Sequence, residues 1–278
     1  MLREEPGPLP DFMRVCVCLR QVPDPRARLE LRTDGTGLRE DGVAWVTDEG
    51  DECALEEALR LVRQTGGEVC ALTAGPGRAA ETLRRALALG AQRALHLRGE
   101  LPLDPSRVAD LLAAVLRREA WDVVITGAQS SDLGWGLTGS SLAAGLGWPH
   151  VWLVVGIETE GDSKDTRLRI TRELEGRRRE LSRVRLPAVL CVQTGLHPPR
   201  MPRIRDLLAA KNTPIETLAL DDLLSDSHGE EARPAVELVA LSAPTASSGG
   251  EQLGGDPATA ARELVRRLRR DGILPETT

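Results

Sequence analysis

The chain has 278 residues and a mass of 30.1 kDa; 41% of the residues are hydrophobic and 28% are charged. This length accommodates one large α/β domain with appendages or two modest domains, and the apolar fraction supports a core, which excludes global disorder. No apolar run approaches the roughly 20 residues of a membrane-spanning helix, so we expect no membrane insertion. A net charge of -6, one Phe and no Tyr leave little basis for nucleic-acid binding, which we also exclude.

The N-terminus and the cysteines bear on the cellular compartment. Residues 1–12 lack an apolar stretch after a basic start, so we interpret them as a flexible arm and not as a signal or import sequence. An odd number of cysteines, five, in apolar settings indicates a reducing cytoplasm. Cys16 and Cys18 share one face of an apolar run, but no second ligand pair accompanies them, so we interpret them as packed strand residues.

Short apolar runs alternate with amphipathic stretches in the first half of the chain. Acidic residues open the first expected helix, and Asp104 with Pro105 forms an N-cap and first turn for the third. The expected strands cover 14–19, 68–75, 93–97 and 121–129, and the expected helices cover 48–66, 76–91, 104–120 and 137–148. This alternation predicts an α/β fold with a mostly parallel sheet covered by helices on both faces.

The pattern changes in the second half. Residues 151–160, 166–174 and 179–194 contain strand runs, which we expect to form antiparallel additions and a final core strand. A proline-rich loop that leads into a short helix follows over 196–223, and 234–244 resembles one more strand. A flexible linker then precedes an amphipathic helix over 258–274, and the pattern leaves open whether that helix docks on its own sheet or on a partner.

A glycine-rich stretch follows the strand 121–129. The carboxyl edge of a parallel strand is the usual ligand site in open α/β sheets, and a helix start offers free N–H groups to an anion. The stretch is neither a Walker A loop nor a dinucleotide fingerprint, so its spacing leaves a nucleotide site and a plain glycine turn both open. The residues concerned are Gly127, Gly134, Gly136 and Gly139, with hydroxyl groups from Thr138, Ser140 and Ser141.

No catalytic set accompanies this stretch. The sequence has no nucleophile elbow, no H-E-x-x-H motif and no metal-ligand cluster. The carboxylates of Asp48, Glu49, Asp51 and Glu52 precede a helix, where they complement its dipole, and we favour that role over acid/base chemistry. The residues therefore predict a nucleotide-binding module that is not an enzyme.

The order of the motifs resembles the β subunit of electron transfer flavoproteins. The likeness runs from about residue 14 to 224. It is carried by QVPDP, ECALEEALRL, LTAGPGRAAETLRRALALGA, DVVITGAQSSD and RELEGRRRELSRVRLPAVLCVQTGLHPPRMPRI, in that order. Each motif alone is modest, whereas five in register over some 200 residues are specific.

This resemblance implies a Rossmann-like fold of the adenine-nucleotide-hydrolase type, without hydrolysis. It implies a heterodimer in which the α subunit holds most of the FAD and this chain holds an AMP. The complex would carry electrons from flavin dehydrogenases to a membrane oxidoreductase or another acceptor. The implied organisation is an arm over 1–12, a nucleotide-binding domain over 13–224, and a linker and arm over 225–278 that dock on the α subunit.

The resemblance also implies site residues. The expected cofactor contacts are Cys18, Asp48, Glu49, Gly50, Asp51, Ala74, Gly127, Gln129, Asp132, Gly134, Gly136, Leu137 and Thr138. The family's partner-recognition loop matches residues 199–211. There Ile204 corresponds to the leucine anchor, and Arg200, Arg203 and Arg205 would steer the approach.

Three departures from the family pattern affect these expectations. Asp48-Glu49 stands where an Asn-Pro pair is usual, and Pro25 and Gly50 stand where relatives place aromatic residues against the flavin. The phosphate loop reads DLGWGLTG, with Trp135 at its centre as either a ligand contact or a residue packed on the partner.

Two alternatives remain at this point. An electron-bifurcating relative would hold a second FAD in place of AMP; QVPDP favours it, whereas DPSRVADLLAA replaces the motif typical of that second site. A stand-alone adenine-nucleotide-binding module is the other alternative. The extended tail and proline-rich loop argue against it, because a self-sufficient domain needs neither.

Overall fold

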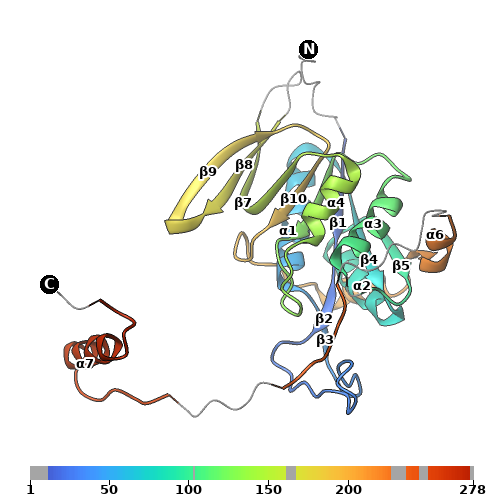
Figure 1. Cartoon of the computed structure of the whole chain (residues 1–278). Helices are drawn as coiled ribbons and strands as arrows, with labels where there is room; N and C mark the ends of the chain where they lie inside the picture. The colour runs from blue at the N-terminus through green and yellow to red at the C-terminus, as the bar shows by residue number, and fades with distance from the viewer. Residues whose placement is uncertain (1–11, 103, 161–166, 227–235, 244–249, 276–278) are drawn as a thin grey trace. The chain divides into compact units, whose positions relative to one another are not determined.

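A computed structural model describes residues 12–102, 104–160, 167–226, 236–243 and 250–275 of the chain (Figure 1). Residues 1–239 and 240–278 form two compact units, which are described separately. The arm expected for residues 1–12 lies outside the described residues except for Phe12.

The first unit is built on one large sheet, and its described strands follow the order β11-β5-β4-β1-β6-β10-β7-β8-β9. The pairs from β11 to β7 are parallel, whereas β8 and β9 extend the sheet antiparallel through β7 (Figure 1). The strands are β1 (Met13–Cys18), β4 (Gly67–Gly75), β5 (Arg93–Arg98), β6 (Val123–Gly127), β7 (His150–Glu160), β8 (Arg167–Leu174), β9 (Arg178–Val184), β10 (Ala188–Val192) and β11 (Glu216–Ala219). The expected α/β class, parallel core and antiparallel additions are confirmed.

Helices cover both faces of the parallel strands. One apolar layer joins α1 (Glu49–Thr65) and α2 (Ala80–Leu89) to β1, and the other joins α3 (Pro105–Leu116) and α4 (Thr138–Leu146) to the opposite side of the same strand. Alternation along β1 produces this division, because Val15 and Val17 face the first layer while Cys16 and Cys18 face the second. The expected packed strand cysteines are therefore confirmed.

Capping residues in the sequence mark where helices begin. The Asp104 carboxylate accepts a hydrogen bond from the Ser106 backbone N–H at 2.9 Å, and Pro105 occupies the first turn of α3, as predicted. A short 3-10 turn, η1 (Gly77–Ala79), leads into α2, and a second, η2 (Glu175–Arg177), joins β8 to β9. A small antiparallel hairpin of β2 (Gln21–Pro23) and β3 (Trp45–Thr47) fills the turn-rich stretch after β1.

Two expectations for the later chain are corrected. Residues 236–243 of the expected strand 234–244 have no regular secondary structure, and the Val239 side chain is 94% exposed. An apolar run becomes a strand only when a sheet edge pairs with it, and no described strand pairs with this one. The short segment 216–219 forms the edge strand β11 beside β5, and α5 (Ile204–Ala210) and α6 (Leu220–Asp226) flank it.

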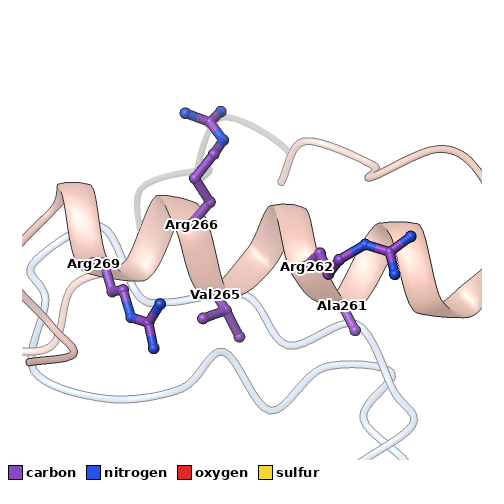
Figure 2. A pocket seen from close by; sticks show the side chains of 5 residues that line it. All are labelled: Ala261, Arg262, Val265, Arg266 and Arg269. Carbon is purple, nitrogen blue, oxygen red and sulfur yellow. The ribbon is translucent and has the colours of Figure 1, made fainter. Parts of the chain in front are cut away.

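The second unit contains the helix α7 (Pro257–Arg270), which the sequence predicted as amphipathic. Asp256 caps its start by accepting hydrogen bonds from the backbone N–H groups of Ala258 and Thr259. Figure 2 shows the five side chains that line a pocket on this helix, namely Ala261, Arg262, Val265, Arg266 and Arg269. None of its described helical residues is buried.

Candidate nucleotide-binding site

The candidate site lies at the carboxyl edge of β4, β1 and β6, which are neighbours in the sheet. Ala74, Cys18 and Gly127 stand at or near the ends of these three strands. This edge is where an open α/β sheet normally places its ligand. The structure thus brings together three of the expected site residues that are far apart in the sequence.

The Asp48 side chain connects the start of α1 to the loop after β6 through hydrogen bonds. Its carboxylate is buried; Oδ1 accepts a hydrogen bond from the Gly50 N–H at 3.0 Å, and Oδ2 accepts from the N–H and the hydroxyl of Ser131, both at 2.7 Å. The side chain therefore caps the start of α1 and also ties the loop to it. Its hydrogen bonds to the protein occupy both carboxylate oxygens.

The Asp51 side chain makes a second connection, between the start of α1 and the ends of β1 and β6. One oxygen accepts a hydrogen bond from the Arg20 N–H and the other from the Gly127 N–H, each at 2.7 Å. Burial raises the pKa of Asp51 to about 7 and the nearby Asp48 carboxylate adds to the rise, while the two N–H donors oppose it. The carboxylate joins the ends of β1 and β6 instead of complementing its own helix.

Glycine is required where α1 meets β6. A Cβ atom at Gly127 would lie 2.8 Å from Asp51 Oδ1 and 3.0 Å from the Gly50 carbonyl carbon. At Gly50, a Cβ atom would lie 3.4 Å from the Gly127 Cα. The two glycines therefore allow close contact between the helix start and the strand end. This contact explains their positions without a ligand.

The loop between β6 and α4 is shaped by its own hydrogen bonds. Gly134 and Gly136 adopt left-handed φ angles of +65° and +63°, and the Gln129 side-chain amide donates to the Gly134 carbonyl at 2.6 Å. Asp132 pairs with the Arg20 guanidinium at 2.6 Å. Trp135 is exposed in the middle of the loop, where both a ligand and a partner surface could reach it.

The start of α4 offers unused donors. Leu137 occupies the N-cap position without a capping side chain, so the first backbone N–H groups of the helix lack that partner. Within the described part of the chain, the hydroxyl groups of Thr138, Ser140 and Ser141 make no hydrogen bond. Backbone N–H groups at a helix start together with free hydroxyls suit a phosphate.

A family model described as electron transfer flavoprotein domain matches residues 36–223. The chain belongs to the electron transfer flavoprotein family. Curated relatives named electron transfer flavoprotein subunit beta include that of Methylophilus methylotrophus, 35% identical over 216 residues, which are 76% of this chain and 81% of the relative. The Bacillus subtilis protein is 30% identical over 260 residues (92% and 98%), and the human protein 31% over 269 residues (94% and 99%). Within the family, the chain is therefore a β subunit.

Several of the family-derived site residues occupy unexpected roles. The Asp48 and Asp51 carboxylates accept hydrogen bonds from the backbone of the chain itself, and Glu49, between them in the sequence, is exposed. Arg20 and Ser131, which donate hydrogen bonds to these carboxylates, were not among the expected site residues. Their positions directly after β1 and inside the glycine-rich loop were the only signals available. The expected contacts of the whole set with a nucleotide remain predictions.

The predicted recognition loop exposes apolar residues. Met201, Ile204 and Leu208 are exposed by 80%, 79% and 57%, and Ile204 begins α5. Arg205 is also exposed and pairs with Asp206 at 3.2 Å, whereas Arg200 binds the buried Glu56. The geometry makes Ile204 accessible to a partner, and its role as an anchor remains a prediction.

The buried Cys191 and its neighbours do not form a reactive centre. Thr126 donates to the Cys191 sulfur at 3.3 Å, and His150 Nε2 lies 3.3 Å from it. Burial raises the pKa of Cys191 to about 11 and lowers the pKa of His150, so the neutral forms of both are favoured. Across the described residues, no cluster of cysteine, histidine and carboxylate side chains could hold a metal ion.

Proposed function

We propose that this β subunit works as an electron carrier in a heterodimer with an electron transfer flavoprotein α subunit, with AMP bound in this chain and FAD held mainly by the α subunit. The observation that supports it most directly is the uncapped start of α4, with its free hydroxyls, at the carboxyl edge of β6. In this proposal the complex takes electrons from flavin dehydrogenases and passes them to a membrane oxidoreductase or another acceptor in the cytoplasm. In the described part of the chain, no helix is both long and apolar enough to pass through a bilayer.

The residues present fit an AMP. The phosphate would lie against the backbone N–H groups at the start of α4 and the hydroxyl of Thr138, where the helix dipole favours negative charge. Cys18 and Ala74, at the neighbouring strand ends, would line the adenosine. Asp48 and Asp51 would act indirectly, because their hydrogen bonds hold the loop that surrounds the phosphate.

This chain would contribute structure and recognition to the FAD site of the complex. FAD supplies the electron-accepting and electron-donating chemistry when it is bound. Pro25 and Gly50 leave this chain without the aromatic contacts expected at those positions, so flavin packing would come largely from the α subunit. Residues 225–278 would dock on that subunit and 199–211 on the dehydrogenase.

Co-purification and nucleotide analysis test this proposal. The full chain is expressed with an electron transfer flavoprotein α chain from the same genome, and the nucleotides of the purified complex are extracted and quantified. We expect one FAD and one AMP per heterodimer. Two FAD and no AMP would replace the proposal with the bifurcating alternative. A chain that stays alone with a bound adenine nucleotide would favour the stand-alone module.

A further inference from the structure

The predicted recognition loop, residues 199–211, is approached by one face of α1. Cys53, Glu56, Glu57 and Arg60 are spaced three and four residues apart, so they lie on the same side of that helix. The chain between β10 and α5 follows this side: the Gly195 N–H faces the Cys53 sulfur, and the next two polar contacts involve Glu57 and Glu56. The loop thus has a polar attachment before its exposed apolar residues begin.

Glu56 and Arg200 make the main contact of this attachment. Glu56 is buried, and its carboxylate accepts hydrogen bonds from two nitrogens of the Arg200 guanidinium, from Nε at 2.7 Å and also from Nη2. Burial acts to raise the pKa of Glu56, but the hydrogen bonds and charge of Arg200 outweigh it and the pKa lies below its usual value. Arg200 is therefore held inward and is not a free surface cation.

A second buried carboxylate reinforces the attachment. Glu57 is buried beside Glu56 and contacts His197 through Oε1 and the ring nitrogen Nδ1. Arg60 Nη1 lies 3.1 Å from Glu57 Oε1 and 3.1 Å from the same His197 nitrogen. His197, just before the loop, and Arg200, near its start, are consequently tied to two consecutive positions of α1.

The far end of the loop is tied to a different helix. Arg84 of α2 donates a hydrogen bond from Nη1 to the Ala210 carbonyl at 2.7 Å, and Ala210 is buried. A guanidinium at the last carbonyl groups of a helix satisfies an unpaired acceptor and complements the dipole. The short helix α5 is therefore held at its carboxyl end, while Arg200 is held four residues before its first residue.

Between these two attachments, the loop turns its apolar side chains outward. Met201, Ile204 and Leu208 follow a spacing of three and four residues, so in α5 Ile204 and Leu208 lie on one face. A binding surface that is already rigid loses less conformational freedom on association. Polar attachments at both ends would supply that rigidity without covering the apolar face.

We propose that Glu56 and Arg84 are positioning residues, which hold the Ile204–Leu208 face in its binding conformation from both ends. Glu56 acts through Arg200, and Arg84 acts through the Ala210 carbonyl. The proposal rests on the proposed function of residues 199–211 as the surface for a flavin dehydrogenase. It assigns Arg200 to holding the loop and not to long-range steering of the partner.

Two measurements on the intact complex with the α chain, amide hydrogen exchange and enzyme kinetics, distinguish holding of the loop from long-range steering of the partner. The variants are Glu56→Gln, Arg200→Gln, the double variant and Arg84→Gln. Arg84→Gln leaves no buried carboxylate unpaired and so provides a test if the Glu56 variants fold poorly. Arg169→Gln, which breaks an exposed pair with Glu158, is the matched control. The measurements are amide exchange in peptides covering 197–212, and the KM of a flavin dehydrogenase that reduces the wild-type complex, at low and high salt.

If these residues position the loop, each of the Glu56, Arg200 and Arg84 variants should speed amide exchange in residues 197–212 by about tenfold. Each should also raise the KM several-fold, while kcat and flavin content are kept. The effects of Glu56→Gln and Arg200→Gln should not be additive in the double variant, because both substitutions break the same Glu56–Arg200 contact. The effects should persist at high salt. Unchanged exchange in all the variants would overturn the proposal. Faster exchange without a KM effect, in a complex where Ile204→Ala does raise KM, would overturn it as well.

Two other results would also count against it. An Arg200→Gln effect on KM that disappears at high salt, with Glu56→Gln neutral, would indicate steering. If Ile204→Ala leaves the KM unchanged, the proposed recognition surface itself fails, and the positioning role fails with it.

Discussion

The buried Asp51 carboxyl at the start of α1 is expected to make the free energy of unfolding depend on pH. The Asp51 carboxyl has an ordinary pKa of 3.8 and a folded-state pKa of about 7. Between these values the folded chain holds a proton that the unfolded chain has released, so the free energy of unfolding falls as the pH rises. The stability contribution of the protonated group is lost as the pH passes through the folded-state pKa.

Asp51→Asn tests this titration. The substitution removes the ionisable group. The asparagine NH2 would, however, face one of the two backbone N–H donors that Asp51 now binds, and leaving that donor unpaired would cost about 1–3 kcal/mol of stability. We therefore expect the variant to be less stable at about pH 5 and to approach the wild type towards about pH 8. Urea unfolding across this range measures both curves. Parallel curves would show that Asp51 is ionised throughout.

Among the helices, α4 provides the sharpest test of the nucleotide site. Bulky substitution at Gly139 would be uninformative, because a Cβ atom there would overlap the Cys191 sulfur in the core. Thr138 begins the helix and is not among the buried residues of α4. A side-chain change at Thr138 therefore alters the charge near the proposed phosphate while leaving the packing of α4 in place.

Thr138→Glu places a carboxylate where the phosphate is expected. A negative charge in the first turn interacts favourably with the helix dipole, by about 0.3–1 kcal/mol, so the fold should be kept while AMP is repelled. Thr138→Gln is the uncharged control. We expect at least about tenfold less co-purified AMP in the Glu variant than in the Gln variant, with lower assembly yield and with the flavin chemistry retained in dimers that form. Equal AMP contents would remove the phosphate from this helix start.

The helix α7 supplies a second prediction. Its apolar side chains, with Ile273 just beyond the helix, remain accessible within the unit, and Figure 2 shows the Arg266 side chain pointing away from Val265. The apolar set is Ala260, Leu264, Val265, Leu268 and Ile273. Docking of this set on the α subunit would contribute of the order of several kcal/mol.

Deleting residues 255–278 should weaken the heterodimer. The double substitution Leu264→Ala and Leu268→Ala should reproduce much of the loss, because it removes the apolar stripe while the helix remains. Arg266→Ala, on the polar side, is the control. Sizing chromatography with serial dilution measures the association, and unchanged dissociation of the truncated complex would place the arm elsewhere.

The helix α1 connects the two candidate sites. Asp48 and Asp51 at its start hold the loop of the candidate nucleotide site, while Glu56 and Glu57 hold the segment before α5. A single helix therefore supports both the proposed AMP site and the proposed recognition surface. Damage to α1 should affect both, whereas a change confined to the exposed face of α5 should affect only partner binding.

Ile204→Ala is that confined change. Its side chain is largely exposed in the chain, so truncation should leave folding and flavin content unaltered. We expect electron transfer from the dehydrogenase to slow by about tenfold at sub-saturating concentration, equivalent to about 1.4 kcal/mol. Stopped-flow reduction by the dehydrogenase measures the rate, and reduction by dithionite is the control. A wild-type rate would exclude Ile204 as the anchor.

The local pattern of the sequence determined most of the fold. Apolar periodicity located the core strands and helices, and Asp104 with Pro105 marked a helix start that the structure reproduces. The glycine-rich stretch was placed correctly between β6 and α4. These features depend on residues that are neighbours in the chain, and this is why periodicity and capping rules detect them.

The roles of the charged residues follow from contacts between segments that are far apart in the chain. Asp51 binds the N–H of Gly127, 76 positions away, and Arg200 binds Glu56 across 144 positions. The local pattern favoured a helix-dipole role for Asp51, and the family resemblance implied that Asp51 contacts the cofactor and that Arg200 steers a partner. We also expected a strand over 234–244 and did not expect β11, because an edge strand depends on which sheet edge is free to pair. Pairing and burial arise between distant segments, and no local pattern records them.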